Sequence, residues 1–225
     1  MRERIAVVGD VHGNARALAR AFEWLETWDG LVIFVGDYVN RGPASREVVD
    51  HLILAKDALG ERLVLLRGNH DQVLLDFISG ESPRRLLSHG GLTTVSSYLK
   101  GTEAQASIET FRETFPDGHL RLLGDTGTHF ETDEMLVSHA GYNPDRPTSR
   151  RSEDLALGRH HGIFSRGATA PKALIICGHY IQRGMKPFES RNLICLDTGS
   201  GTTAGAPLTL VTLPDRNFYQ FYGET

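Results

Sequence analysis

Carboxylate, amide and imidazole side chains recur directly after apolar runs in this 225-residue sequence. The first half contains the motifs GDVHG, GDYVNRG and RGNHD, and the second half contains VSHAG and ICGHY. The residues in them that could hold a metal ion are Asp10, His12, Asp37, Asn69, His139 and His179. Mixed oxygen and imidazole donors suit Mn, Fe or Zn, and the lack of cysteine among them argues against a soft-metal site. The motifs therefore predict a site for divalent metal ions.

Strands and helices must alternate in the first half to position these side chains. Apolar runs at residues 5–8, 31–35 and 63–66 predict buried strands, and each is followed by a stretch with helical periodicity, the last at residues 70–78. This alternation favours a mostly parallel sheet covered by helices, with right-handed crossovers. Because ligands bind outside the carboxyl ends of parallel strands, we expect the three motifs at one edge of the sheet.

The second half is predicted to form a second, more antiparallel sheet. Its expected strands are residues 119–123, 129–131, 135–138, 173–177, 193–196, 208–213 and 218–222. Residues 145–172 are rich in arginine, glycine and proline, which indicates a long surface excursion. No repeat or composition shift marks a boundary, so we expect a single domain over residues 1–225.

Composition excludes several classes of protein. The net charge of −4 provides no general basic field, so nucleic acid is not an expected partner. Cys177 and Cys195 both lie in apolar runs, which is typical of buried, reduced thiols rather than a disulfide framework. The sequence shows neither a signal peptide nor an apolar segment long enough to cross a membrane, so we expect a cytoplasmic protein.

The five motifs, in this order, resemble those of the calcineurin-like metallophosphoesterases, in particular the phosphoprotein phosphatase branch. The resemblance spans nearly the whole chain, and residues 89–98, 139–147 and 196–210 are similar to small bacterial members grouped with symmetrical diadenosine tetraphosphatases and Ser/Thr phosphatases. It implies an α/β fold, a four-layer α-β-β-α sandwich of two mixed sheets flanked by helices, with the metal site at the carboxyl ends of the strands.

The resemblance also implies two divalent ions, with Mn favoured and Fe, Zn or Ni as alternatives. Asp10, His12 and Asp37 would hold one ion. The other would be held by Asp37, which bridges, and by Asn69, His139 and His179. A hydroxide bridging the two ions would attack the phosphorus atom, so no covalent enzyme intermediate is required. The implied substrate is a phosphoprotein or a nucleotide polyphosphate.

Two further residues receive roles from the resemblance. His70 would be the general acid that protonates the leaving oxygen, and Arg41 would bind the phosphate bidentately. A second arginine usually helps in this branch. The best match for it is Arg159, in LALGRHHGIF, with Arg150 and Arg166 as alternatives.

GDYVNRG departs from the usual GDxxDRG of this branch at Asn40. The aspartate usually found there is hydrogen-bonded to the general-acid histidine. The amide oxygen of Asn40 can accept a hydrogen bond but carries no charge, so the pKa of His70 should fall. Asp71 compensates if its side chain turns toward the ring. We hypothesise that Asn40 favours substrates whose leaving group needs little protonation, such as phosphoanhydrides and aryl phosphates; alternatively, Asn40 replaces Asp with only modest loss.

The favoured function is a metal-dependent phosphatase acting on phosphomonoesters or phosphoanhydrides, similar to Ser/Thr protein phosphatases. The alternatives are a symmetrical dinucleoside tetraphosphatase, a phosphodiesterase and a metal-bound interaction module without activity. The single histidine of ICGHY argues against a phosphodiesterase, and the intact His70 and Arg41 argue against the module. Structural or surface roles are expected for the other histidines, which are His51, His89, His119, His129, His160 and His161.

Overall fold

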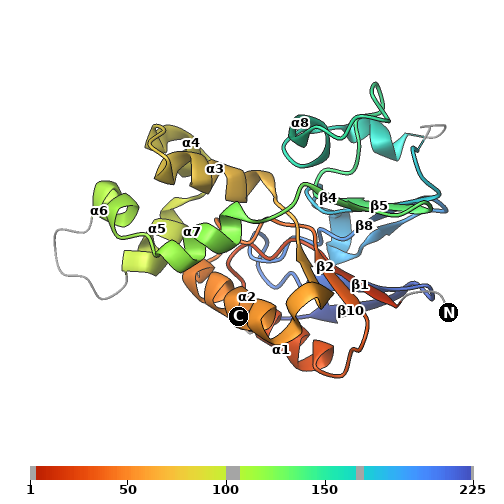
Figure 1. Cartoon of the computed structure of the whole chain (residues 1–225), viewed down its shortest axis with the longest axis horizontal. Helices are drawn as coiled ribbons and strands as arrows, with labels where there is room; N and C mark the ends of the chain where they lie inside the picture. Colours follow the sequence, from red (N-terminus) through yellow and green to blue (C-terminus); the bar gives the residue numbers. More distant parts are fainter. Residues whose placement is uncertain (1–3, 100–106, 166–169, 224–225) are drawn as a thin grey trace.

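Two five-stranded sheets form the framework of the computed structural model, which describes residues 4–99, 107–165 and 170–223 (Figure 1). The strands are β1 (Ile5–Val8), β2 (Leu31–Phe34), β3 (Leu63–Leu65), β4 (His129–Glu131), β5 (Met135–Ser138), β6 (Leu174–Cys177), β7 (Phe188–Glu189), β8 (Leu193–Cys195), β9 (Leu208–Leu213) and β10 (Asn217–Phe221). The first sheet has the order β10-β9-β1-β2-β3, and the second has the order β4-β5-β6-β8-β7. Both sheets contain parallel and antiparallel pairs, so both are mixed.

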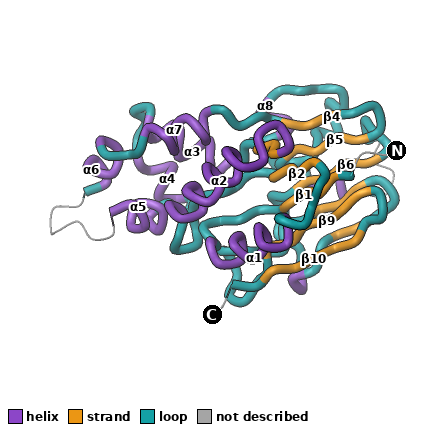
Figure 2. Tube along the Cα trace, turned by 60° about the horizontal axis from the view of Figure 1, so that its bottom comes forward, coloured by secondary structure: helices purple, strands orange, loops and turns teal. Residues whose placement is uncertain are grey.

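Helices of unequal number cover the outer faces of the two sheets. The helices are α1 (Ala15–Leu25), α2 (Ser45–Leu59), α3 (Asn69–Ile78), α4 (Pro83–Ser88), α5 (Leu92–Leu99), α6 (Ile108–Glu113), α7 (Asp117–Gly124) and α8 (Ser152–Leu155), with short 3₁₀ turns at Gly60–Arg62, His161–Phe164 and Arg183–Met185. Figure 1 shows α1 and α2 on the side of the first sheet and α8 beyond the second. Helices α2 to α7 gather at one end of the molecule, and the strands lie at the other (Figure 2).

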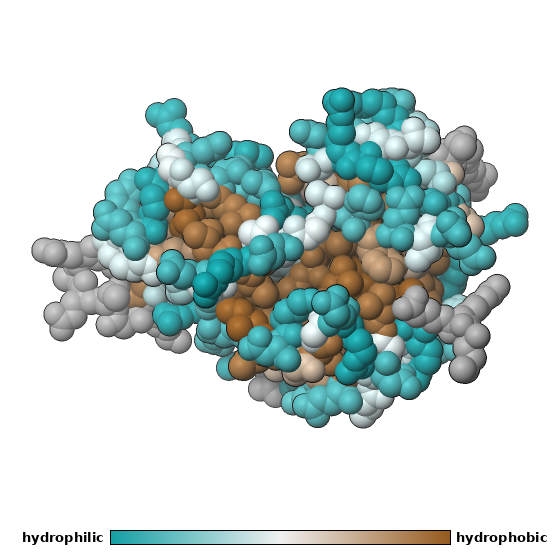
Figure 3. Space-filling model, viewed as in Figure 1, coloured by the Kyte–Doolittle hydropathy of each residue, from teal (hydrophilic) through white to brown (hydrophobic). Residues whose placement is uncertain are grey.

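Apolar side chains hold the layers together. Val7 and Ile33 of the first sheet pack against Val137 and Ile176 of the second, and water is excluded between the sheets. A larger cluster lies between the first sheet and its helices, and a smaller one covers the outer face of the second sheet. In the space-filling view, hydrophobic residues show over the strands at the middle of the face, and hydrophilic residues cover much of the periphery (Figure 3). The predicted α/β fold with four layers and two mixed sheets is confirmed. The fourth layer, which contains α8 on the outer side of the second sheet, is thin (Figure 1).

Local sequence accounts for the strand-turn-helix units of the first half. The Asn14 side chain accepts a hydrogen bond from the Ala17 amide at 3.2 Å, which caps the first turn of α1. Leu18, Ala21 and Leu25 then follow at helical spacing and are buried. Among the described residues, no helix is both long enough and apolar enough to cross a lipid bilayer.

Two expectations about the second half are wrong. Residues 119–123 belong to α7, not to a strand, because the two buried positions His119 and Leu123 are four residues apart, as on one face of a helix. Strands β9 and β10 belong to the first sheet, where β9 pairs antiparallel with β1. The apolar alternation of a strand predicts that it is a strand but not which strand it pairs with.

Candidate metal centre

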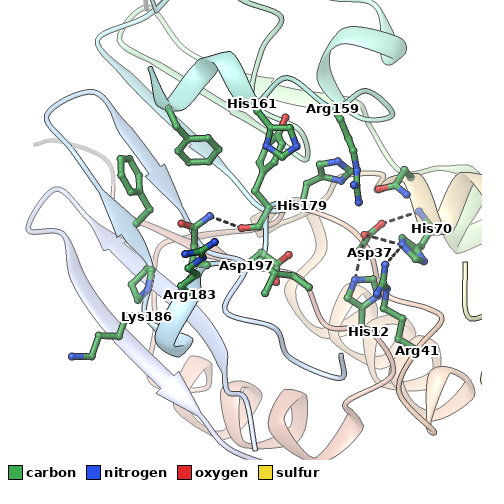
Figure 4. Close-up of a pocket in the computed structure, with 17 residues that line it drawn as sticks. His12, Asp37, Arg41, His70, Arg159, His161, His179, Arg183, Lys186 and Asp197 are labelled. Carbon is green, nitrogen blue, oxygen red and sulfur yellow. Dashed lines mark hydrogen bonds and ion pairs between the residues drawn. The ribbon is translucent and has the colours of Figure 1, made fainter. Parts of the chain in front are cut away.

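The six predicted metal-binding residues lie at the carboxyl ends of strands from both sheets. Asp10 and His12 follow β1, Asp37 follows β2, and Asn69 begins α3 after β3. The other two follow the central strands of the second sheet, His139 after β5 and His179 after β6. All of these side chains except that of Asn69 are at least nine-tenths buried. The two sheets therefore bring residues from distant parts of the chain to one place. Figure 4 shows His12, Asp37 and His179 there in close-up.

The donor atoms converge on the Asp37 carboxylate. Asp37 Oδ2 lies 3.4 Å from His12 Nε2 and 3.3 Å from His139 Nε2. His139 Nε2 in turn lies 3.2 Å from Asn69 Oδ1 and 3.0 Å from His179 Nδ1. Asp37 is thus shared between a group with His12 and His70 and a group with His139 and His179.

These separations fit divalent ions. Two ligands at right angles, each about 2.1 Å from an ion, lie roughly 3 Å apart, which matches the spacings around His139 and Asp37. Two imidazole nitrogens and an amide oxygen facing one carboxylate form a donor set that a cation satisfies. Asp10 is buried beside them, but its carboxylate accepts hydrogen bonds from the His179 amide, at 3.0 and 3.2 Å, and belongs to neither group. The residues therefore fit two divalent ions, and Asp10 lies next to this donor set.

The backbone is strained at the residues that supply these groups. His12, Asp37 and His179 have φ angles of 46°, 55° and 66°, in the left-handed region that non-glycine residues rarely occupy. Close packing fixes the carboxylates as well. A Cβ atom at Gly68 would lie 2.0 Å from Asp37 Oδ1, and one at Gly178 would lie 1.8 Å from Asp10 Oδ1. Only glycine fits at these two positions.

Asp71 holds the loop that carries Asp37. Its buried carboxylate accepts hydrogen bonds from the backbone amides of Asp37 (2.8 Å), Tyr38 (2.9 Å) and Gly68 (3.0 Å). A longer contact of 3.4 Å reaches the Val39 amide. The Asp71 side chain therefore binds the loop and does not turn toward the His70 ring. The compensation for Asn40 that the sequence left open, in which Asp71 would contact this ring, is not seen. Neighbouring side chains on a helix point in different directions, which is the physical reason.

Burial and neighbouring charge set the protonation of the carboxylates in opposite ways. Burial raises the pKa of Asp10 well above its usual value, and the nearby Asp197 and Asp37 raise it further. Burial also raises the pKa of Asp197. For Asp37, burial acts in the same direction, but the surrounding His139, His70 and His12 hold its pKa well below the usual value. The shared carboxylate is thus the one kept ionised by its surroundings.

The Asn40 amide faces His70 with its nitrogen rather than its oxygen. Asn40 Nδ2 lies 3.2 Å from His70 Nδ1, because the Asn40 oxygen already accepts a hydrogen bond from the Thr94 hydroxyl at 2.9 Å. The ring nitrogen Nδ1 then acts as an acceptor, which corresponds to a neutral imidazole with its proton on Nε2. Burial lowers the pKa of His70 to about 3, although the neighbouring Asp37 carboxylate acts in the opposite direction.

The predicted phosphate-binding arginines differ in their surroundings. Arg41 and Arg159 are both exposed and line the cavity that contains Asp37 and His70. Arg41 Nη2 lies 3.4 Å from His70 Nε2, so it reaches the general-acid candidate. Arg150 instead forms a bidentate ion pair with Glu131, at 2.6 and 2.9 Å. Arg166, the other alternative, lies outside the described residues.

Three residues at or beside this site were not predicted from the sequence. Asp197 is buried and lines the cavity, yet it lies in LDTGS, outside the five motifs. Its position directly after an apolar run was the available signal. Thr94 contacts Asn40 from α5, and no sequence pattern links the two. His161, expected in a structural or surface role, lines the same cavity.

Comparison with known proteins agrees with the fold. The family described as "Calcineurin-like phosphoesterase" matches residues 3–183. The chain is 34% identical over 137 residues to a symmetrical bis(5′-nucleosyl)-tetraphosphatase of Burkholderia pseudomallei (strain 668), covering 60% of this chain and 41% of that protein. It is 35% identical over 96 residues to the serine/threonine-protein phosphatase PP2A-like PPG1 of Saccharomyces cerevisiae, covering 42% of this chain and 26% of that protein.

These matches span less than half the length of either relative. A crystal structure of a metallophosphoesterase from Sphaerobacter thermophilus superimposes with a TM-score of 0.57 at 17% identity, covering 99% of this chain and 88% of that chain, and so shares its fold. The family match extends over most of the sequence and includes all six candidate metal ligands. The chain belongs to the calcineurin-like phosphoesterase family.

Proposed function

We propose that this protein is a metal-dependent phosphatase that hydrolyses phosphomonoester or phosphoanhydride bonds. The observation that carries the proposal is the convergence of His12 and His139 on one oxygen of Asp37, at 3.3 to 3.4 Å, inside a cavity lined by three exposed arginines. Family membership and the names of both relatives support the same class of reaction.

The six candidate ligands are Asp10, His12, Asp37, Asn69, His139 and His179. When bound there, two divalent ions supply an activated water and neutralise charge on the phosphoryl oxygens. Manganese is the first choice, and iron, zinc and nickel suit the same donors. Asp71 keeps Asp37 in place through the backbone amides around it, so its role is to position a ligand rather than to contact substrate.

The remaining groups would act on the substrate directly. Arg41, which lines the cavity, would bind the phosphoryl oxygens through its guanidinium group, and Arg159, another lining residue, would add a second contact. As a neutral ring, His70 would donate a hydrogen bond from its Nε2–H to the departing oxygen, and full proton transfer would require its imidazolium form. Its hydrogen-bond partner Asn40 carries no charge, so this donor is weak, and substrates with stable leaving groups suit it best.

Phosphoproteins and nucleotide polyphosphates are the two substrate classes that this reaction accommodates. The cytoplasmic location, the single-domain organisation and the absence of nucleic-acid or membrane partners stay predictions. The two other candidates, a phosphodiesterase and an inactive metal-bound module, make different predictions about the activity.

The test is hydrolysis of p-nitrophenyl phosphate by protein loaded separately with Mn, Fe, Zn and Ni, with metal content measured by mass spectrometry. We expect metal-dependent release of p-nitrophenol, strongly reduced in Asp37→Asn. The control Asp215→Asn, at an exposed position outside the cavity, should retain wild-type activity. Folded protein that takes up metal yet releases no phosphate with any of the four would support the inactive module. Preferential hydrolysis of bis(p-nitrophenyl) phosphate would support the phosphodiesterase.

A further inference from the structure

The cavity at the metal centre extends well beyond the six candidate ligands. Its volume is about 620 Å³, and its lining includes residues 181–183 and 186–188, between β6 and β8. Figure 4 shows Arg183 and Lys186 on the opposite side of this cavity from His70 and Arg41. A single phosphate group bound at the metal centre would leave this second half of the cavity unfilled. The shape therefore indicates a substrate that continues past the phosphate being cleaved.

Aromatic rings form one continuous wall from the metal centre to the far end. His179 contacts Tyr180 with ring centroids 4.8 Å apart, and Tyr180 contacts Phe164 at 5.2 Å. Phe164 then contacts Phe188 at 5.2 Å, with the two planes 86° apart. Tyr180 is buried, whereas Phe164 and Phe188 are partly exposed and line the cavity. The far end thus offers aromatic surface against which a planar ring can pack.

Cations without carboxylate partners lie along the same cavity. Arg183 and Lys186 are exposed, and neither forms an ion pair with any acidic side chain in the part of the chain that the structure describes. Several other basic side chains of the same half form ion pairs. Arg150 and Lys172 both contact Glu131, at 2.6 and 3.1 Å. The two unpaired cations are therefore available to an anionic ligand.

We infer that Arg183, Lys186 and Phe188 form a subsite for the part of a nucleoside oligophosphate that lies beyond the cleaved phosphate. Arg183 and Lys186 would bind the additional phosphate groups, and the base would pack on Phe188. The inference rests on the proposed phosphatase function and names its substrate class. Hydrolysis forms a bond between a water oxygen and the bound phosphorus. It breaks the bond to the bridging anhydride oxygen, which departs with the electron pair, and one water proton is released.

The combination of neighbouring cations and aromatic surface favours this class over a phosphopeptide. A nucleoside oligophosphate carries several negative charges close to a planar ring, and both features have a counterpart on this wall. A phosphoserine peptide carries one obligatory phosphate and no obligatory ring. It would use the metal centre but leave Arg183, Lys186 and Phe188 without a required partner.

The experiment compares kcat/KM on diadenosine tetraphosphate, inorganic tripolyphosphate, a phosphoserine peptide and p-nitrophenyl phosphate. For the double variant Arg183→Ala/Lys186→Ala, we expect kcat/KM on diadenosine tetraphosphate and on tripolyphosphate, each relative to p-nitrophenyl phosphate, to fall about tenfold or more, mainly through KM. For Phe188→Leu, the ratio should fall for diadenosine tetraphosphate but not for tripolyphosphate, because tripolyphosphate has no ring. The exposed Arg191, outside the cavity, provides the matched control Arg191→Ala, which should leave every ratio unchanged.

The possible failures are distinguishable. If wild-type protein hydrolyses none of the four substrates, the proposed function itself is wrong. If p-nitrophenyl phosphate is hydrolysed but the double variant changes no ratio, the subsite is overturned while the phosphatase function stands. A selective loss on the phosphoserine peptide would assign this wall to peptides and would also overturn the inference.

Discussion

The side-chain nitrogen of Asn40 lies 3.2 Å from Nδ1 of His70 and donates a hydrogen bond to it. This polarity is the reverse of the one expected from the sequence, in which the Asn40 oxygen would accept from the ring. The reversal follows from the Thr94 hydroxyl, which donates to the Asn40 oxygen at 2.9 Å and so leaves the nitrogen to face the imidazole. His70 is thereby held as a neutral ring, and its pKa, lowered by burial to about 3, is consistent with that state.

Asn40→Asp should restore a charged partner for His70. A carboxylate accepts a hydrogen bond from Nδ1–H and favours the imidazolium, so the pKa of His70 rises and the protonated acid persists to higher pH. We expect the alkaline limb of the pH–rate profile to move upward. The gain in kcat should be larger for a phosphoserine peptide, whose alkoxide leaving group needs a proton, than for diadenosine tetraphosphate. Equal gains on both substrates would contradict the link between Asn40 and leaving-group preference. The control is Asn217→Asp, the same change at an exposed position, which should leave both rates unchanged.

Thr94→Val should test whether the Thr94 hydroxyl positions the general acid through Asn40. The change removes the hydroxyl that donates a hydrogen bond to the Asn40 side-chain oxygen. The same hydroxyl is one of two that accept a hydrogen bond from the Asn40 backbone N–H, and the change in volume is small. A buried group left without its partner costs about 1–3 kcal/mol, so the free energy of unfolding measured in urea should fall by that amount. We also expect a lower kcat with little change in KM. Thr114→Val, which alters an exposed hydroxyl, should stay within about 0.5 kcal/mol of wild type.

Removal of metal should destabilise the folded protein. Asp10 and Asp197 are buried beside Asp37, and a bound cation relieves the electrostatic cost of ionising them together. At a free metal concentration of about 100 times Kd, the stabilisation is about 2.7 kcal/mol. Addition of EDTA should therefore lower the melting temperature, and Mn²⁺ should restore it. His179→Ala should abolish the metal-dependent part of the shift, whereas His129→Gln, outside the metal centre, should retain it. A melting temperature that is indifferent to metal in wild-type protein would contradict the site.

The sequence predicted which candidate ligands lie close together better than it predicted the sheets around them. Polar groups directly after apolar runs mark the carboxyl ends of strands, so the local pattern was sufficient to nominate residues such as His139 and His179. Pairing between strands depends on contacts far apart in the sequence. For this reason β9 and β10 were placed in the wrong sheet, although both were recognised as strands. The partners of Asn40 and the cavity wall at Arg183 were not predicted for the same reason, because each is formed by chain segments that only the fold brings together.

Glu131 should make stability depend on pH on the acidic side. Its carboxylate accepts a bidentate pair of hydrogen bonds from Arg150, at 2.6 and 2.9 Å, and Lys172 adds a contact at 3.1 Å, which together lower its pKa from 4.5 to about 2. Because the pKa is lowered in the folded state, the stabilisation is present above pH 4.5 and is lost as the pH falls toward 2.

Glu131→Gln should therefore cost about 1 kcal/mol of unfolding free energy at neutral pH, a modest value because water screens this partly exposed network. The difference from wild type should shrink steadily between pH 4.5 and pH 2, where the native carboxylate takes up its proton and the two proteins carry the same charge at this position. Urea denaturation at several pH values in this range measures the difference in unfolding free energy between the two proteins. Glu134→Gln, three residues away and exposed, should show no such dependence, and a constant difference for Glu131→Gln at every pH would mean that shape rather than charge stabilises the contact.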